Sequence, residues 1–251
     1  MWLVLVGFLI FGLAFFCYAK EPLKVVAAEH KLLQYQQNGN LKGPSAEIFK
    51  LLIKYAKLEQ GVEFYPWSRA YNIAENRPNT VIFSMVRTKE REDKFTWLIK
   101  VSGLVRAFIS KKSIPQNYVN SIEQAKTKSV VAVRDSYSHN SLIKNGFSEN
   151  KNLYLVASIE EAISLFEQNK VELIYTDPNV VKNYYLALKR KADNLIHYVL
   201  LPETRRDGYI AINKNSDSIL IKKLQKAAAQ IELLESYQHF LNYKPLLNWF
   251  N

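Results

Sequence analysis

Short apolar runs alternate with segments of helical periodicity through the first half of the chain. Three runs bounded by turn residues are typical of buried strands, at 23–28, 62–65 and 80–84. Between the first two, Ile48, Leu51 and Tyr55 fall on one face of a helix that begins after Gly43. Strand, helix and strand in this order predict a parallel sheet with helical crossovers.

The same alternation begins again after residue 128. Further strands are predicted at 104–110, 129–133, 153–156, 171–175, 196–201 and 209–212. Helices are predicted at 134–145, at 158–168, from Asp177-Pro178 onward, and in the tail at 216–234 and 235–250. We therefore expect an α/β protein of two lobes, each a mostly parallel sheet flanked by helices, with a ligand cleft between them.

Two linkers between the lobes define the predicted boundaries. The first lobe spans 20–106 and the second 107–210, and a helical tail at 211–251 returns to pack on the first lobe and the hinge. The hinges are expected near 105–108 and 207–211. In this arrangement the carboxyl ends of both sheets face one groove, where ligands of such sheets bind.

The first 19 residues carry no charge and are typical of a secretory signal peptide. They end in Cys17-Tyr18-Ala19, and polar sequence starts at Lys20. We therefore predict cleavage near Ala19 and a periplasmic protein. No Lys or Arg precedes the apolar core, so an uncleaved membrane anchor is the alternative, and the mature N-terminus would decide between the two.

Cysteine content and charge exclude several classes of site. Cys17 is the only cysteine, so a cleaved chain has no disulfide, thiol nucleophile or Cys-ligated metal. The 4 histidines share no metal-ligand spacing, and we predict neither a metal nor a cofactor. The net charge of +11 is spread over helices, which is typical of solvated faces. The sequence shows no nucleic-acid-binding module.

A polar segment after the predicted strand 80–84 contains a candidate ligand-binding group. Thr88 begins a predicted helix, and Arg91 lies in its first turn. Ligands of open α/β sheets bind beyond the carboxyl ends of the strands, where a guanidinium can bind a carboxylate through two hydrogen bonds. The alternative is a surface arginine paired with Glu90 or Asp93, and the segment alone favours neither interpretation.

Several short motifs follow one another along the mature chain. They are Gly39-Asn40-Leu41-Lys42-Gly43, Pro66-Trp67-Ser68-Arg69-Ala70, Phe83-Ser84-Met85, Arg87-Thr88, Glu90-Arg91, Val131-Ala132-Val133-Arg134, Glu160-Glu161-Ala162 and Tyr175-Thr176-Asp177-Pro178. In this order and spacing the chain resembles bacterial extracellular solute-binding proteins of family 3, the periplasmic polar amino-acid-binding type with the type II periplasmic binding fold. The resemblance covers nearly the whole mature chain.

The resemblance implies a clamp in which both lobes hold one zwitterionic ligand. Arg91 takes the position of the arginine that binds the carboxylate of the amino acid. Glu29 and Asp177 take the positions of the acids that meet its ammonium group. The other implied ligand-binding residues are Ser84 before the arginine, Ser136, Tyr137 and Ser138 at a helix start in the second lobe, and Trp67 and Arg69 of the Pro-Trp-x-Arg motif.

Several of these residues also have a structural explanation. Asp177 precedes a proline and suits a helix cap, as do Ser136 and Ser138. Trp67 suits core packing. These alternatives need no ligand and stay open at this point.

The chain also departs from the family pattern at two positions near the implied site. Asp135 stands where the family has a glycine, which adds a negative charge beside the helix start of the second lobe. Val86 stands at a position that is polar in the family. These departures leave a changed ligand as the alternative to an amino acid.

The predicted function is that of an exported, monomeric, non-catalytic solute-binding protein. It would clamp a small polar solute, an amino acid or a related carboxylate, for an ABC-type importer. Its partners would be this small molecule and an inner-membrane permease or receptor. A sensory domain coupled to a receptor is one alternative. A dehydratase-like enzyme is another, and would need Glu29, Asp177 or a histidine as its acid or base.

Overall fold

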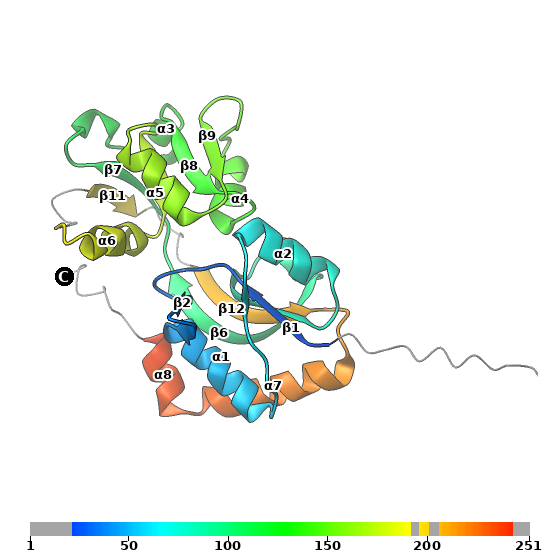
Figure 1. Cartoon of the computed structure of the whole chain (residues 1–251). Helices are drawn as coiled ribbons and strands as arrows, with labels where there is room; N and C mark the ends of the chain where they lie inside the picture. The colour runs from blue at the N-terminus through cyan, green and yellow to red at the C-terminus, as the bar shows by residue number, and fades with distance from the viewer. Residues whose placement is uncertain (1–21, 192–195, 201–205, 243–251) are drawn as a thin grey trace, which may run out of the picture.

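The computed structural model describes residues 22–191, 196–200 and 206–242, so the predicted signal peptide lies outside it. Two lobes are seen one above the other in Figure 1, each built on a 5-stranded sheet. The two-lobed α/β architecture expected from the sequence is confirmed. Within the described residues, no helix has the length and apolar character needed to cross a membrane.

The sheet of the first lobe combines parallel and antiparallel pairing. Its strands, in spatial order, are β4 (Glu63–Phe64), β1 (Lys24–Ala27), β5 (Thr80–Val86), β12 (Arg206–Asn213) and β6 (Phe95–Leu104). β1 runs parallel to β4 and β5, whereas β12 runs antiparallel to β5 and β6. Val81, Ile82 and Phe83 in β5 are fully buried, which explains why this strand is an unbroken apolar run.

The sheet of the second lobe repeats this plan. Its strands, in spatial order, are β11 (Ile196–Leu200), β7 (Ala107–Lys111), β10 (Leu173–Thr176), β8 (Val130–Val133) and β9 (Leu153–Val156). β8 runs parallel to β9 and β10, and β7 runs antiparallel to β10 and β11. The three parallel strands therefore direct their carboxyl ends to the same edge, as in the first lobe.

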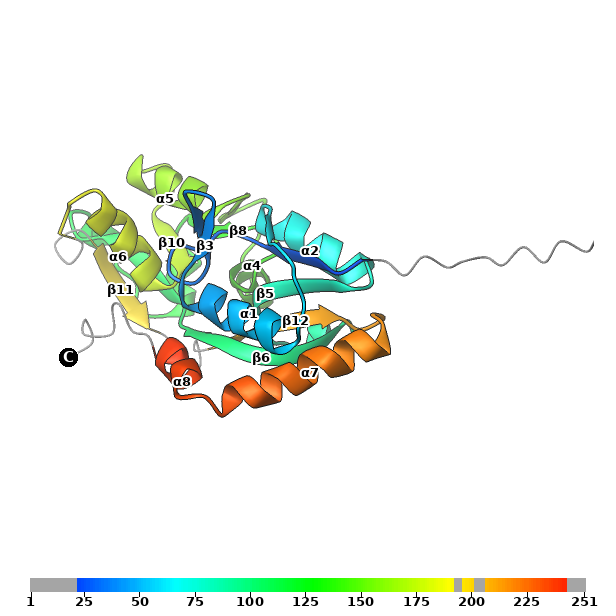
Figure 2. The same ribbon diagram turned by 60° about the horizontal axis from the view of Figure 1, so that its bottom comes forward.

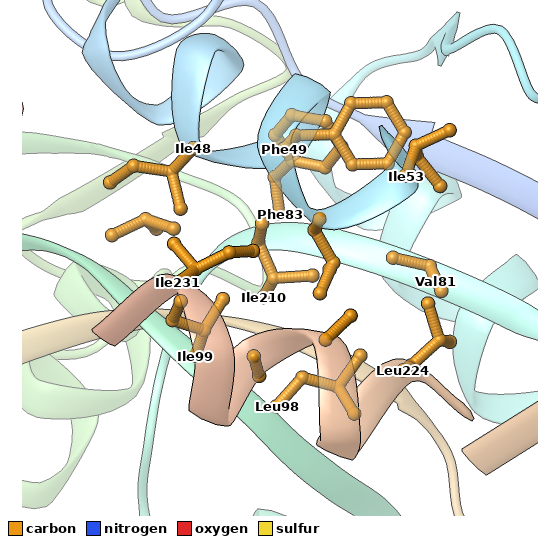
Figure 3. Close-up of a cluster of buried hydrophobic side chains, with 14 of the residues drawn as sticks. Ile48, Phe49, Ile53, Val81, Phe83, Leu98, Ile99, Ile210, Leu224 and Ile231 are labelled. Atoms are coloured by element: carbon orange, nitrogen blue, oxygen red, sulfur yellow. The ribbon is translucent and has the colours of Figure 1, made fainter. Parts of the chain in front are cut away.

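Helices cover both faces of the first sheet. They are α1 (Pro44–Tyr55), α2 (Trp67–Asn76), α7 (Ser218–Glu232) and α8 (Glu235–Leu241). α1, α7 and α8 pack on one face around Phe49, Phe83 and Ile231, as Figure 3 shows for the first two helices. α2 packs on the other face, where Ala70 and Ala74 lie against β1 and β5. Figure 2 shows α1, α7 and α8 on the same side of the sheet.

The second lobe is layered in the same way. Its helices are α3 (Ile122–Ala125), α4 (Tyr137–Lys144), α5 (Ile159–Glu167) and α6 (Pro178–Ala187). α5 and α6 pack on one face around Phe166 and Tyr185, and α3 and α4 on the other around Leu142 and Phe147. The remaining elements are the hairpin β2 (Tyr35–Gln37) and β3 (Asn40–Lys42), and two short 3-10 turns, η1 (Lys89–Arg91) and η2 (Pro115–Asn117).

The chain crosses from the first lobe to the second at Val105 and Arg106, between β6 and β7. These residues lie within the segment 105–108 that was predicted to contain the first hinge. The chain has returned by Arg206, the first residue of β12. The predicted lobe boundary at residue 210 and the predicted second hinge at 207–211 therefore both lie inside a strand of the first sheet. The start of β12 could not be recognised from the sequence, because its first residues, Arg206 to Gly208, are not apolar.

Strand β6 and the segment after Thr88 differ from the sequence prediction, and the short strands β2 and β3 were not predicted either. β6 was not predicted, because its apolar residues are interrupted by Thr96, Lys100 and Ser102 without regular alternation. The helix expected from Thr88 is only the single turn η1. The predicted end of the tail helix, beyond residue 242, lies outside the described residues.

Candidate functional site

A cavity of about 450 Å³ lies between the two lobes. Its wall is formed by the carboxyl ends of β5, β8 and β10 and by segments that follow β1, β4 and β9. The first turn of α4 and the hinge residue Arg106 complete it. This is the place where open α/β sheets bind ligands, and it is the shared groove expected from the sequence.

Arg91 presents its guanidinium to this cavity and is only 4% exposed. Nη1 donates to the carbonyl oxygen of Val86 at 2.9 Å, and the guanidinium lies 5.0 Å from the centre of the Tyr71 ring. Burial lowers the pKa of Arg91, but an arginine stays protonated in proteins. The result is a buried cation held in place by a carbonyl and an aromatic face.

The surface ion pair considered for Arg91 is not formed. Glu90 instead pairs with Lys144 of the second lobe, and Asp93 pairs with Lys214 at 3.4 Å. Among the described residues, no carboxylate lies within ion-pair distance of Arg91. A guanidinium in this state suits a carboxylate supplied by a ligand.

The carbonyl oxygen of Asp135 ties the lobes together beside the cavity. It accepts the indole Nε1 of Trp67 at 2.8 Å and Nη2 of Arg91 at 3.5 Å. Asp135 has a φ of 56°, in the left-handed region that glycine adopts freely and aspartate tolerates. The aspartate at the family's glycine position thus keeps a glycine-like backbone, and its own side chain is half exposed.

The first turn of α4 brings the three predicted residues of the second lobe to the cavity. Ser136 caps the helix by accepting the backbone N–H of His139 at 3.2 Å. Ser138 is buried, and its Oγ accepts Nε of Arg106 at 2.9 Å. The structural role considered for Ser136 is therefore present. Unpaired backbone N–H groups at a helix start favour an anion.

Ser84 and Trp67 also line the cavity. Ser84 has a φ of 50° at the end of β5, and its Oγ donates to Oε1 of Gln34 at 2.7 Å. Nε2 of Gln34 in turn donates to the carbonyl oxygen of Ala28 at 2.9 Å. Ser84 thus positions the buried amide of Gln34, a cavity residue that the sequence analysis missed.

The two carboxylates on the cavity wall lie at its rim. Glu29 is exposed, pairs with Lys31 at 3.3 Å and accepts the backbone N–H of Gln36 at 3.1 Å. Glu160 in the first turn of α5 is exposed as well. A ligand ammonium would therefore meet acids at the entrance of the cavity and arginine deeper inside.

Asp177 and Arg69 are not brought to the cavity wall. Asp177 is 4% exposed and caps α6, accepting the backbone N–H of Asn179 at 2.9 Å and that of the hinge residue Val105 at 3.2 Å. Arg69 is exposed and stacks 4.5 Å above the centre of the Tyr65 ring. The geometry supports the capping explanation of Asp177 rather than contact with a ligand ammonium.

Arg106 and His30 line the cavity but were not among the predicted site residues. Nη1 of Arg106 donates to the carbonyl oxygen of Val105 at 2.8 Å. His30 Nδ1 is buried and has no hydrogen-bond partner in the described structure. Burial and the charge of Arg106 lower the pKa of His30 to about 4, so the imidazole is neutral at pH 7. One feature of the sequence pointed to Arg106, because it is a single charge inside the apolar run 104–110.

Sequence comparison gives no relative: no family profile and no curated protein matches this chain. Solved structures do match. An ancestral arginine-binding protein bound to arginine has a TM-score of 0.73 at 18% identity, covering 87% of this chain and 95% of its own. The arginine-, lysine-, histidine-binding protein ArtJ from Geobacillus stearothermophilus has a TM-score of 0.74 at 16% identity, covering 90% and 96%.

A histidine kinase sensor domain similar to periplasmic binding proteins also matches, with a TM-score of 0.72 at 14% identity over 88% of this chain and 95% of its own. At these identities the likeness establishes the fold. The chain has the two-lobed periplasmic-binding-protein fold expected from its sequence. The described residues contain no cluster of His, Cys, Asp or Glu side chains that could hold a metal.

Proposed function

We propose that this chain is a non-catalytic solute-binding protein that closes its two lobes on a small polar molecule with a carboxylate, such as an amino acid. The observation that carries the proposal is the buried guanidinium of Arg91 on the wall of the cavity between the lobes. The named ligands of the structural neighbours, arginine, glutamine and glutamate, all carry a carboxylate. The fold and the charged group therefore support the same class of ligand.

The mechanism would be that of a clamp. A ligand carboxylate pairs with Arg91 in the first lobe while the amino end of α4 contacts it from the second. Closure removes water, which strengthens these interactions. The ligand shifts the equilibrium between open and closed forms only by its preference for the closed form. The Asp135 carbonyl oxygen adds two hydrogen bonds that exist only when the lobes meet.

The place of action we propose is the periplasm, with delivery to an ABC-type importer by a monomer. The uncharged first 19 residues support export. One structural neighbour is described as the substrate binding protein of an amino acid ABC transporter. A receptor-coupled sensor is the second candidate, favoured by the likeness to a histidine kinase sensor domain. Mass determination of the mature N-terminus separates them, because a start near Lys20 fits a free carrier and a retained anchor fits a sensor.

The carboxylate assignment is tested with the purified protein and a panel of amino acids and small organic acids. Thermal shift identifies a ligand, and calorimetry then gives its dissociation constant. Arg91→Ala should weaken binding by about 30-fold or more, since it removes one partner of a buried charge pair, worth about 2–5 kcal/mol.

Arg87→Ala is the matched control for Arg91→Ala. It removes an exposed guanidinium four residues earlier in the chain, which pairs with Glu92 at 2.7 Å, and it should leave the affinity unchanged. Equal affinities of the wild type and Arg91→Ala would refute the proposed site.

A further inference from the structure

Arg106 gives the cavity a second guanidinium, contributed by the hinge rather than by either sheet. Nε and Nη1 each have one acceptor, Ser138 Oγ at 2.9 Å and Val105 O at 2.8 Å. Neither acceptor carries a charge. In the described part of the chain, no carboxylate lies within ion-pair distance of Arg106.

Arg91 and Arg106 converge on the start of the same helix. Nη2 of Arg91 reaches the carbonyl oxygen of Asp135, and Nε of Arg106 reaches Ser138 Oγ, three residues further along the chain. Between these two contacts lie Ser136 and Tyr137, where α4 begins. Two cations and the positive end of a helix therefore surround the same part of the cavity.

Among the described residues, none of the acids near the cavity forms an ion pair with Arg91 or Arg106. Glu29 and Glu160 are exposed at the rim, and Glu29 already pairs with Lys31. Asp177 attracts Arg106, but its two oxygens accept the N–H groups of Asn179 and Val105. Partly buried cations without an ion-pair partner carry a desolvation cost that an anionic ligand removes.

His30 supplies a third observation at the same place. Its Nδ1 is a buried polar atom without a hydrogen-bond partner in the described structure, and the residue lines the cavity. Arg106 is the charged residue whose field acts on it. A buried polar atom without a partner costs stability unless a ligand or water satisfies it. An anionic group held by Arg106 would therefore lie close to His30.

We infer, given the proposed function, that the ligand is a small dicarboxylic acid, held by Arg91 at one carboxylate and by Arg106 and His30 at the other. Arg106 is then the residue that determines specificity. A cationic side chain such as that of arginine would approach a guanidinium without an intervening acid. The preference would therefore be opposite in charge to that of the arginine-binding proteins that share the fold.

Pairs of probes that differ in one group test this inference by calorimetry. L-glutamate and L-glutamine differ only in the second carboxylate, and glutarate lacks the amino group of L-glutamate. The wild type should bind L-glutamate at least about 30-fold more tightly than L-glutamine, as expected for one charged hydrogen-bonded contact. L-arginine should not bind. Glutarate should bind within about tenfold of L-glutamate, because neither inferred contact involves the amino group.

Arg106→Gln should reduce the preference for L-glutamate over L-glutamine to about threefold or less, chiefly by weakening L-glutamate binding. Arg106→Lys should retain part of the preference, because it keeps the charge. Arg87→Gln should leave the ratio unchanged. Near-ultraviolet circular dichroism of each variant confirms that the native packing is retained.

The outcomes separate this inference from the proposed function. If the wild type binds L-glutamine or L-arginine as tightly as L-glutamate, the inference is wrong while the solute-binding function stands. An unchanged ratio in Arg106→Gln also overturns it. If neither the amino acids nor the organic acids bind, the proposed function fails and the inference fails with it.

Discussion

β5 and β10 are the central strands of the two sheets, but the polar side chains that follow them have different roles. After β5, Arg91 turns its guanidinium to the cavity and keeps donors beyond those bonded to two carbonyl oxygens. After β10, both oxygens of Asp177 accept backbone N–H groups, and the residue does not reach the cavity wall. One strand end presents a guanidinium to the cavity, and the other supplies a helix cap.

The difference shows that position at a strand end is not sufficient to bring a polar side chain to the cavity wall. What decides is whether the backbone nearby already uses the hydrogen-bonding capacity of the side chain. Asp177 is short and precedes Pro178, so its oxygens meet the first free N–H groups of α6. Arg91 is long and has five N–H donors, so donors remain after its local contacts are made.

The largest expected effect on stability comes from Asp177→Ala. This change removes the cap of α6 and leaves the N–H of Val105 without its acceptor, so the free energy of unfolding should fall by about 2–3 kcal/mol. Ser158→Ala is the matched control, since Ser158 only caps α5 in the same lobe, and it should cost about 1 kcal/mol. Urea unfolding followed by circular dichroism measures both. Equal losses would mean that the hinge contact contributes nothing.

The next largest effect is a pH-dependent change in the free energy of unfolding, of about 1–3 kcal/mol, that arises from His30. Because its pKa is lowered from 6.5 to about 4 in the folded protein, the unfolded chain binds a proton first as the pH falls. The contribution of His30 to stability is therefore complete above pH 6.5 and is lost progressively toward pH 4. The difference in unfolding free energy between the wild type and His30→Asn should change over this range. A constant difference would contradict the burial of His30.

Trp67→Phe tests the contact between the lobes. It removes the indole N–H that reaches Asp135 while keeping an aromatic ring, and should cost about 1 kcal/mol, or about fivefold in ligand affinity through a less populated closed form. Lys144→Ala breaks the exposed ion pair with Glu90 across the same boundary and should have no measurable effect. Calorimetry compares the two. If Lys144→Ala lowers the ligand affinity more than Trp67→Phe does, the ion pair and not the indole hydrogen bond would be the contact that stabilises the closed form.

The smallest effect is expected at Asp135. Asp135→Gly should change the free energy of unfolding by less than about 0.5 kcal/mol, because relief at a φ of 56° opposes the extra freedom of glycine in the unfolded chain. Asp135→Ala should lose about 1 kcal/mol, since alanine tolerates this conformation less well. Melting temperatures of the three proteins rank them, and an alanine variant as stable as the wild type would contradict the strain argument.

Much of the fold could be predicted from the sequence because its parallel strands are buried on both faces. β5 and β8 are apolar runs with sharp ends, and Ser158 and Asp177 mark helix starts by their chemistry. β6 escaped prediction because Thr96, Lys100 and Ser102 interrupt its apolar residues at irregular intervals, so its pattern matches neither a strand nor a helix.

The candidate site was predictable only in part. Arg91 could be proposed because it follows a clearly marked strand and takes the position of an arginine in the family that the sequence resembles. Arg106, His30 and Gln34 come from the hinge and from a loop whose path depends on packing between distant segments. The cap formed by Asp177 could be expected from its place before Pro178. Its second contact, with the N–H of Val105, could not be expected, because it joins residues far apart in the sequence.

The position of β12 has a consequence for the order in which this protein folds. β12 lies between β5 and β6 and pairs with both, yet it follows the entire second lobe along the chain. During synthesis the second sheet becomes complete once residue 200 is available, whereas the first must wait with an open gap for a strand from 206–213. Pairing over such sequence separation is slow. The lobe that begins first should therefore mature last, with its unpaired strand edges exposed to self-association in the meantime.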